Sequence, residues 1–327
     1  MASSSADGAP AVNASAVASP AAKKPVVLLI IGMAGTGKTT LVHRLQHHAA
    51  QQRKSMYFVN LDPAVLHVPY NVNIDIRDTV NYKEVMQQYQ LGPNGAILTS
   101  LNLFATKFHQ VVSLLEKKDN VDWIVIDTPG QIEVFTWSAS GQLMTEALRA
   151  ALPTVALFVA DTTRCMNPHT FVSTMLYSSG IMLKQQVPLV VVFNKVDVVT
   201  ADVVVSWMRD EDKWETALAG ESAEGGGGHA ADALAVGGGG GYATTLAQSL
   251  ALFLHEYYED LPFACVSAAS GAGMDQLEAA VAAARVTAEV EMQQAQAHAQ
   301  EVRTARQHQQ LQALVRDGAG DEEAGRS

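Results

Sequence analysis

The sequence predicts an α/β fold in which a mostly parallel sheet is flanked by helices. Six apolar, β-branched runs support this prediction, because helix-like patterns separate most of them. The runs lie at residues 26–31, 56–61, 121–127, 154–160, 189–193 and 263–267. Alternation of this kind places strands in parallel, with helices on both faces. Polar turns follow several of the runs, and ligands of such sheets bind beyond the carboxyl ends of the strands.

The first run leads into a glycine-rich string and then into a helix-like segment. This order matches a phosphate-binding loop, in which GxxxxGKS/T connects a strand to a helix. The glycines allow backbone N–H groups and the helix N-terminus to face phosphate oxygens. Lys38 would reach the β and γ phosphates, and Thr39 would ligate Mg²⁺. The residues expected to hold the nucleotide here are Gly32, Met33, Ala34, Gly35, Thr36, Gly37, Lys38, Thr39 and Thr40.

The second and third runs each lead to an aspartate. Asp62 follows the second run, and it would lie near the phosphates if that strand is parallel to the first. Its expected task is to position Mg²⁺ or water. Asp127 ends the third run, about 90 residues after the loop, where phosphate-loop enzymes hold Mg²⁺ directly or through water. Gln131 and Glu133 come next and could orient a hydrolytic water, although they could also be polar residues of an exposed loop.

A turn after the fully apolar fifth run indicates which base the nucleotide carries. Its sequence is Asn194-Lys195-Val196-Asp197. A carboxylate can accept hydrogen bonds from N1–H and the 2-amino group of guanine, whereas adenine has no matching donors, and buried polar groups would stay unpaired. Asp197 would make this pair, Asn194 would address the other ring edge, and the Lys195 stem would cover the base plane. In isolation such a string is also common as a surface turn. After the last run, Ser267 and Ala268 could supply backbone contact to the guanine oxygen.

The segment Gly92-Pro93-Asn94-Gly95 combines a fixed φ with permissive residues, which predicts a compact, protruding turn that presents an amide. In isolation it would be only a turn. Residues 1–24 are expected to form a disordered tail, and 25–284 the phosphate-loop domain. That domain contains a helix-like insertion with a flexible, glycine-rich part at about 220–242. Residues 285–327 are expected to be a charged, helical to disordered tail.

Composition limits the remaining possibilities. A net charge of −11 argues against nucleic-acid binding as the main activity, so protein partners are the better expectation. No apolar run reaches the roughly 18 residues of a membrane span, so we expect no membrane association. Only Cys165 and Cys265 occur, without metal-type spacing, which fits a reducing compartment such as the cytoplasm.

Taken together, these residues resemble the GPN-loop GTPases, a family of dimeric phosphate-loop proteins named for the tripeptide seen here as Gly92-Pro93-Asn94. Strings such as Asn60 to Ala64, Asn73 to Thr79, Leu101 to Thr106 and Asp127 to Ser140 are similar to the first eukaryotic paralogue. The resemblance implies GTP or GDP with Mg²⁺, a homodimer or a heterodimer with a paralogue, and RNA polymerase II subunits as clients. It also implies a role in polymerase assembly and nuclear import, with shuttling between cytoplasm and nucleus.

The family pattern also implies roles for single residues. Asn94 would meet phosphate or attacking water across the dimer interface, Asp62, Gln131 and Glu133 would position water, and Thr39 and Asp127 would serve the metal. Many dimerising phosphate-loop enzymes carry a second lysine where this chain has Met33, so hydrolysis should be slow here. Two alternatives remain open: a phosphate-loop ATPase, and a nucleotide-stabilised assembly scaffold or chaperone whose hydrolysis is incidental.

Overall fold

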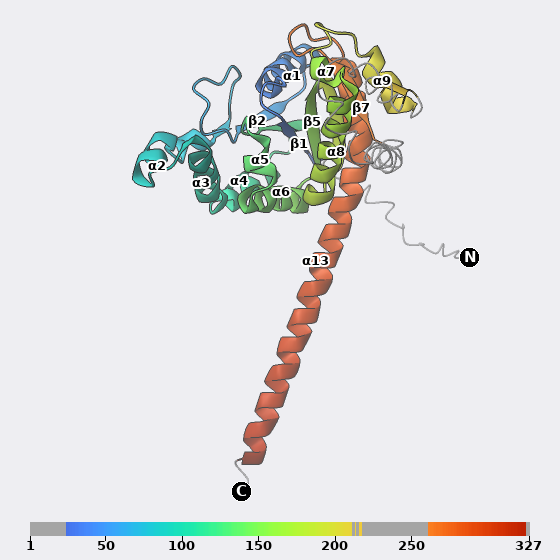
Figure 1. The fold of residues 1–327 in the computed structure, drawn as a ribbon. Coiled ribbons are helices and arrows are strands. Elements are labelled where there is room, and N and C mark those ends of the chain that lie inside the picture. The colour runs from blue at the N-terminus through green and yellow to red at the C-terminus, as the bar shows by residue number, and fades with distance from the viewer. Residues whose placement is uncertain (1–23, 211–212, 214–215, 218–260, 325–327) are drawn as a thin grey trace, which may run out of the picture.

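The computed structural model describes residues 24–210, 213, 216–217 and 261–324 (Figure 1). In this part of the chain, seven strands form one sheet in the order β3-β2-β4-β1-β5-β6-β7, and every neighbouring pair is parallel. The strands are β1 (Val26–Gly32), β2 (Met56–Asn60), β3 (Ile74–Asp75), β4 (Trp123–Asp127), β5 (Thr154–Asp161), β6 (Leu189–Asn194) and β7 (Phe263–Val266). The predicted α/β class and the six predicted strands are confirmed, and β3 is an addition of two residues.

Helices cover both faces of the sheet, as the alternation along β1 shows. Val26, Leu28 and Ile30 pack with α1 and α13, whereas Val27, Leu29 and Ile31 belong to the larger core under the remaining helices. The helices are α1 (Lys38–Gln52), η1 (Ile76–Asp78), α2 (Tyr82–Gln88), α3 (Pro93–Ala105), α4 (Phe108–Glu116), α5 (Ile132–Thr136), α6 (Ala139–Ala151), α7 (Thr162–Cys165), α8 (Pro168–Gln185), α9 (Asp202–Arg209) and α13 (Met274–Ala324). In the described residues, no helix is both long and apolar enough to cross a membrane.

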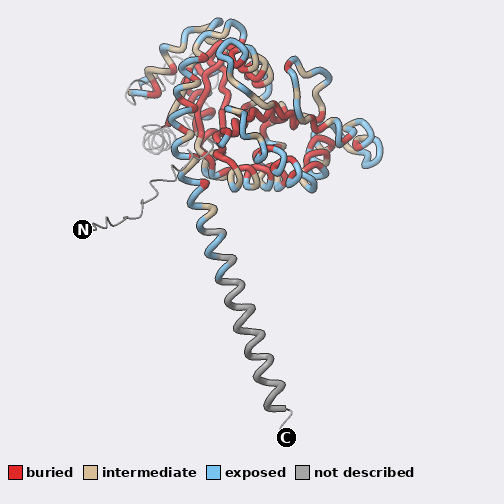
Figure 2. The backbone as a smooth tube through the Cα atoms, turned by 180° about the vertical axis from the view of Figure 1, so that it is seen from behind, coloured by how far each residue is buried: buried red, intermediate tan, exposed pale blue. Residues whose placement is uncertain are grey.

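The C-terminal helix α13 packs on the domain only at its start. Leu277, Val281 and Ala284 are buried against the sheet, and burial continues to Ala288 and Met292. Gln296 still donates its side-chain amide to the Ala150 carbonyl over 2.9 Å, and the helix then leaves the globular part and projects away from it (Figures 1 and 2). The expected C-terminal helix is therefore confirmed. The predicted N-terminal tail and the glycine-rich insertion lie outside the described residues.

The GPN segment is not the compact turn that we expected. Pro93, Asn94 and Gly95 form the first turn of α3, and Gly92 is its N-cap. Proline suits the first helical position, since its fixed φ is helical and its missing N–H would have no partner there. Apolar residues then continue at helical spacing and are buried, namely Ala96, Ile97, Leu101 and Phe104. The segment does protrude, because Gly92, Pro93 and Asn94 are exposed.

Candidate functional site

The phosphate loop connects the central strand β1 to α1 at the carboxyl edge of the sheet. Its backbone requires glycine at residue 37, where φ is +91° and an added Cβ would lie 2.5 Å from Nδ2 of Asn194. Thr36 closes the loop by donating its hydroxyl to the Met33 carbonyl over 2.9 Å. Met33 and Thr39 are half-buried, while Ala34, Gly35 and Thr40 are exposed. The loop therefore folds back tightly on itself, as the glycines of the motif predict.

Lys38 is buried at the start of α1, with only 6% of its surface exposed. Its Nζ donates to the carbonyl oxygens of Gly32 at 2.7 Å, Met33 at 3.1 Å and Gly130 at 3.4 Å. Burial lowers the pKa of Lys38, and the charges of three carboxylates act against that shift. Those carboxylates belong to Asp127, Asp62 and Glu133. The structure therefore brings the phosphate-loop lysine together with three of the predicted acidic residues.

Asp127 is buried at the end of β4 and is only partly satisfied. Its Oδ2 accepts a hydrogen bond from the Tyr70 hydroxyl over 3.1 Å, whereas Oδ1 has no hydrogen-bond partner among the described residues. Burial raises the pKa of Asp127 to about 6, even though the nearby hydroxyls of Thr39 and Tyr70 act in the opposite direction. A buried carboxylate oxygen without a partner, beside a threonine hydroxyl, is a donor set that suits Mg²⁺. The residues predicted for the metal, Thr39 and Asp127, fit that ion.

Asp62 joins the loop after β2 to the turn after β4. Its Oδ1 accepts from the Ala64 N–H at 2.9 Å, and its Oδ2 accepts from the Gly130 N–H at 3.3 Å. Gln131 is the N-cap of α5 and is half-buried, and Glu133 is exposed in the first turn of that helix. Asp62 is therefore hydrogen-bonded to the turn that leads directly to Gln131 and Glu133.

The NKxD turn reaches the phosphate loop through Asn194, which is 2% exposed. Its Nδ2 donates to the Thr36 carbonyl over 2.8 Å, and its Oδ1 accepts from the Ala268 N–H over 2.9 Å. Two backbone segments thus engage this amide, which keeps its second Nδ2 proton and the second lone pair of Oδ1 for a contact with the base. Asn194 joins the turn, the phosphate loop and the loop after β7 into one unit.

The other two polar residues of the NKxD turn are each oriented by a partner. Lys195 has φ +72° and donates its ammonium to Oδ2 of Asp161 over 2.6 Å, which fixes its stem. Burial alone would raise the pKa of Asp161, but hydrogen bonds from Lys195 and Thr163 hold it below its ordinary value. Asp197 is exposed, and its Oδ1 accepts from the Ser267 hydroxyl over 2.6 Å.

Asn94 is the predicted site residue that this structure leaves apart from the others. It is exposed on the first turn of α3. Figure 1 shows α2 and α3 together at one end of the molecule. In residues 24–210 and 261–324, no recorded hydrogen bond or charge interaction joins Asn94 to Lys38, Asp62 or Asp127. The expectation that this amide acts across a dimer interface stays a prediction.

Sequence reasoning did not single out Tyr70, Asn60 or Asp161. Tyr70 lies in a segment without apolar periodicity, so no local pattern marked it as the partner of Asp127. Asn60 ends β2 and donates its side-chain amide to Oδ1 of Asp75 over 3.1 Å, which helps to hold β3 beside it. Asp161 ends β5 in the same way that Asp127 ends β4, and this repeated position at a strand end was a signal that could have identified it.

Comparisons with known proteins place this chain in a family. A family model described as a conserved hypothetical ATP binding protein matches residues 30–286. GPN-loop GTPase QQT2 of Arabidopsis thaliana is 50% identical over 247 residues, which are 75% of this chain and 60% of that protein. GPN-loop GTPase 1 of Schizosaccharomyces pombe is 45% identical over 265 residues, or 80% of this chain and 69% of that protein.

The match to GPN-loop GTPase 1 of Dictyostelium discoideum, 47% identical, covers 78% of this chain and 60% of that protein. The chain thus spans less than two thirds of the Arabidopsis and Dictyostelium proteins. Among solved structures, a GTPase of Pyrococcus abyssi in its apo form aligns with a TM-score of 0.62 at 23% identity. The alignment covers 78% of this chain and 95% of that one, and it shows a shared fold.

Proposed function

The chain belongs to the GPN-loop GTPase family, and from that premise we propose that it binds and hydrolyses GTP as a dimeric switch. The proposal rests on two hydrogen bonds of the Asn194 side chain. Its Nδ2 donates to the Thr36 carbonyl, and its Oδ1 accepts from the Ala268 N–H. These bonds fix the turn that reads the base to the loop that holds the phosphates. A single nucleotide can therefore contact Lys38 at one end and Asp197 at the other.

The choice of guanine over adenine has to be justified, because the matching family model is described as a conserved hypothetical ATP binding protein. Ser267 holds Oδ1 of Asp197 from one side, and no described residue hydrogen-bonds the second oxygen, Oδ2. A carboxylate placed in this way accepts from two adjacent donors, which guanine offers and adenine lacks. Adenine would leave the carboxylate oxygens without hydrogen-bond donors. A site of this kind can prefer GTP over ATP by several orders of magnitude in affinity. Asp197 therefore favours GTP over the alternative of an ATPase.

Competition binding tests the choice of base. A fluorescent GTP analogue bound to the full chain would be displaced by unlabelled GTP or GDP, and ATP would need a concentration at least roughly a hundredfold higher. Displacement by ATP at the same concentration as GTP would overturn the guanine assignment. A protein that binds neither nucleotide would overturn the phosphate site as well.

The groups around the phosphate loop can neutralise the charge of the nucleotide phosphates without a large rearrangement. Mg²⁺, when bound to Thr39 and Asp127, would neutralise charge on the β and γ phosphates. Lys38 now donates to three carbonyls, so its ammonium can exchange those partners for phosphate oxygens at the same place. The backbone N–H groups of the loop and the N-terminus of α1 add further donors. Each of these groups stabilises negative charge that develops on the γ phosphate.

Hydrolysis would use Asp62 and the turn after β4, to which it is hydrogen-bonded. Asp62, Gln131 and Glu133 are placed to orient water, and Asn94 of a second protomer would bring its amide to the γ phosphate or to that water. Met33 occupies the position where many dimerising relatives in the wider phosphate-loop class have a lysine. Without that cation the transition-state charge has fewer partners, so we expect slow turnover.

In this proposal the protein acts as a switch because the bound nucleotide controls its dimerisation. GTP would favour the closed dimer and hydrolysis would loosen it, because only the γ phosphate distinguishes the two states. Light scattering coupled to size-exclusion chromatography tests this directly. A dimer with a non-hydrolysable GTP analogue, looser with GDP, is expected, and a monomer in both states would contradict the switch.

The cellular role rests on the family resemblance. In this proposal the switch assists assembly and nuclear import of RNA polymerase II, as a homodimer or with a paralogue, and moves between cytoplasm and nucleus. The alternative is an assembly scaffold that the nucleotide only stabilises, with incidental hydrolysis. The two differ in whether blocking hydrolysis stops delivery of the client protein.

A further inference from the structure

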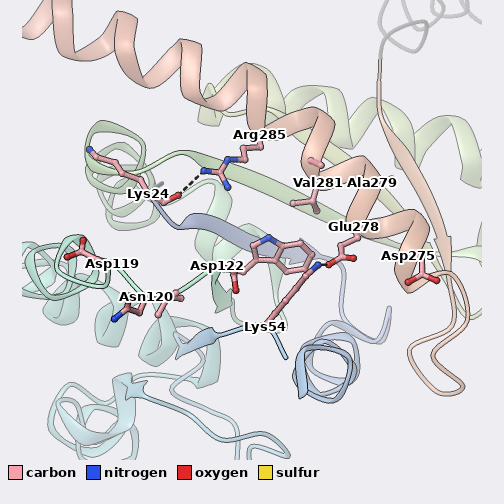
Figure 3. A pocket seen from close by; sticks show the side chains of 13 residues that line it. Lys24, Lys54, Asp119, Asn120, Asp122, Asp275, Glu278, Ala279, Val281 and Arg285 are labelled. Carbon is pink, nitrogen blue, oxygen red and sulfur yellow. Dashed lines mark hydrogen bonds and ion pairs between the residues drawn. The ribbon is translucent and has the colours of Figure 1, made fainter. Parts of the chain in front are cut away.

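A second polar cluster lies away from the proposed nucleotide site, at the amino ends of the strands. A groove of about 850 Å³ runs there between α13 and the segment that leads into β4. Figure 3 shows Asp275 and Glu278 one turn apart on the first part of α13, with the Lys54 side chain extended toward Glu278. Nothing in the proposed GTPase cycle uses these side chains.

His48 completes this cluster from the neighbouring helix α1. It is 8% exposed, and its Nε2 has no hydrogen-bond partner among the described residues. The ligand atoms of His48, Asp275 and Glu278 all lie within 4.8 Å of one another, and His48 Nε2 is 3.9 Å from Oε2 of Glu278. A buried ring nitrogen without a hydrogen-bond partner lowers the stability of the folded protein. A ligand that binds both this nitrogen and the two nearby carboxylates would remove that cost.

We propose that His48, Asp275 and Glu278 bind a divalent transition-metal ion of the Zn²⁺ class. One imidazole nitrogen and two carboxylates are a ligand set that zinc accepts, and water can fill a remaining position from the groove. Mg²⁺ prefers oxygen ligands alone, so this site is chemically distinct from the one at Thr39 and Asp127. The ion would fasten the start of α13 to the helix that begins at the phosphate loop.

Lys54 is the natural competitor for such an ion. Its Nζ contacts Oε1 of Glu278 and also lies 5.8 Å from the centroid of the Trp123 ring. The ammonium could keep the ring contact after it leaves the carboxylate, so metal binding would exchange one cation for another at Glu278. This arrangement predicts that removal of the lysine charge strengthens metal binding.

The same junction already has one clamp that does not involve metal. Arg44 of α1 donates its Nε to the carbonyl of Ala268 over 2.9 Å, in the loop that precedes α13. The metal would be a second clamp, about one helical turn farther along α1, and the two together would stabilise the loop expected to contact guanine. Metal binding should therefore raise the thermal stability of the protein.

The test is a titration of the full chain, stripped with a chelator and free of nucleotide, with Zn²⁺ alone and with Co²⁺ alone. Calorimetry should show one site, the unfolding temperature should rise by several degrees, and Co²⁺ should give visible absorption bands. Glu278→Gln, which keeps the side-chain shape, should weaken binding roughly tenfold or more, and His48→Ala should do the same. Lys54→Met should tighten binding.

A matched control comes from the exposed face of α1, where the rings of His43 and His47 lie 4.9 Å apart. Two histidines four residues apart on a helix can hold a metal by themselves. His47→Ala should leave the affinity of the proposed site unchanged. If binding is lost in His47→Ala and kept in Glu278→Gln, the pair of half-buried His43 and exposed His47 is the site and the proposal is wrong. Unchanged affinity in both Glu278→Gln and Lys54→Met would also overturn it.

Discussion

The side-chain amide of Asn194 donates to the backbone carbonyl of Thr36 over 2.8 Å, although 158 positions separate the two residues. The same amide accepts from the Ala268 N–H. The turn proposed to select the base and the loop proposed to bind phosphate are therefore joined by one buried side chain. Preorganisation of this kind reduces the ordering cost of binding.

Asn194→Ala should weaken GTP binding more than tenfold and lower protein stability. The substitution removes two buried hydrogen bonds and leaves the Thr36 carbonyl and the Ala268 N–H without partners, a cost of about 2 kcal/mol or more. Thermal unfolding and calorimetric titration with Mg²⁺ and GTP measure the two effects. Asn120→Ala, at an exposed position, is the matched control and should change neither. Wild-type GTP affinity in Asn194→Ala would show that the bridge is dispensable.

Asp127 should make the stability of the nucleotide-free protein depend on pH in a distinctive direction. Its pKa is raised from the ordinary 3.8 to about 6, so the folded protein gains stability as pH falls through 6 and the full gain is present below 3.8. Asp127→Asn removes the buried charge and should stabilise the free protein at pH 7.5 by about 3 kcal/mol.

The Mg²⁺-dependent effect has the opposite sign, because the metal needs the charged carboxylate. Stabilisation by Mg²⁺ and GTP should therefore fall as pH drops below about 6 and should be largely lost in Asp127→Asn. Unfolding temperatures of both proteins between pH 5 and 8, with and without Mg²⁺ and GTP, measure this. An Asp127→Asn protein that is less stable than wild type without ligand would contradict the assignment of a carboxylate that burial destabilises and whose Oδ1 has no partner among the described residues.

Asn94→Ala should keep GTP affinity and lose turnover. The amide is exposed on the first turn of α3, and in the proposed function it meets the nucleotide of the second protomer only in the reacting state. Single-turnover hydrolysis and equilibrium binding separate the two quantities. Asn102→Ala, an exposed asparagine farther along the same helix, serves as the control. If binding and turnover both survive in Asn94→Ala, the role across the subunit interface is wrong.

Gln131→Leu distinguishes the switch from the scaffold. The variant should bind GTP and hydrolyse it much more slowly, since the leucine cannot orient water. In cells that depend on this chain, a switch with blocked hydrolysis should leave RNA polymerase II subunits in the cytoplasm, as imaging of a tagged subunit would record. Normal nuclear import with the variant would favour the scaffold.

Much of the fold followed from local patterns in the sequence. The six apolar runs were long enough to predict their strands, whereas the two residues of β3 carry no periodicity. Pro93 was ambiguous, because proline fits both the second position of a turn and the first position of a helix. Only the apolar spacing after it, at Ala96, Ile97 and Leu101, could have indicated the helix.

The site was predictable where a motif specifies backbone geometry, and less so where distant side chains meet. Glycine at residue 37 and the aspartate at the end of β4 could be read from their neighbours in sequence. The contact of Tyr70 with Asp127 spans 57 positions and depends on how an irregular segment folds over the sheet. The orphan nitrogen of His48 likewise depends on where α13 packs, which no local pattern specifies.

The most direct test of the central claim, that the phosphate loop and the NKxD turn hold one guanine nucleotide, is the affinity of Asp197→Asn for GTP and for xanthosine triphosphate. Xanthine has a carbonyl where guanine has the 2-amino group, so an amide at residue 197 can donate to it where the carboxylate cannot. We predict that the wild-type protein prefers GTP and that the variant prefers xanthosine triphosphate, with each preference about a hundredfold or more. An unchanged preference for GTP in Asp197→Asn would contradict the account, because the carboxylate would then not contact the base.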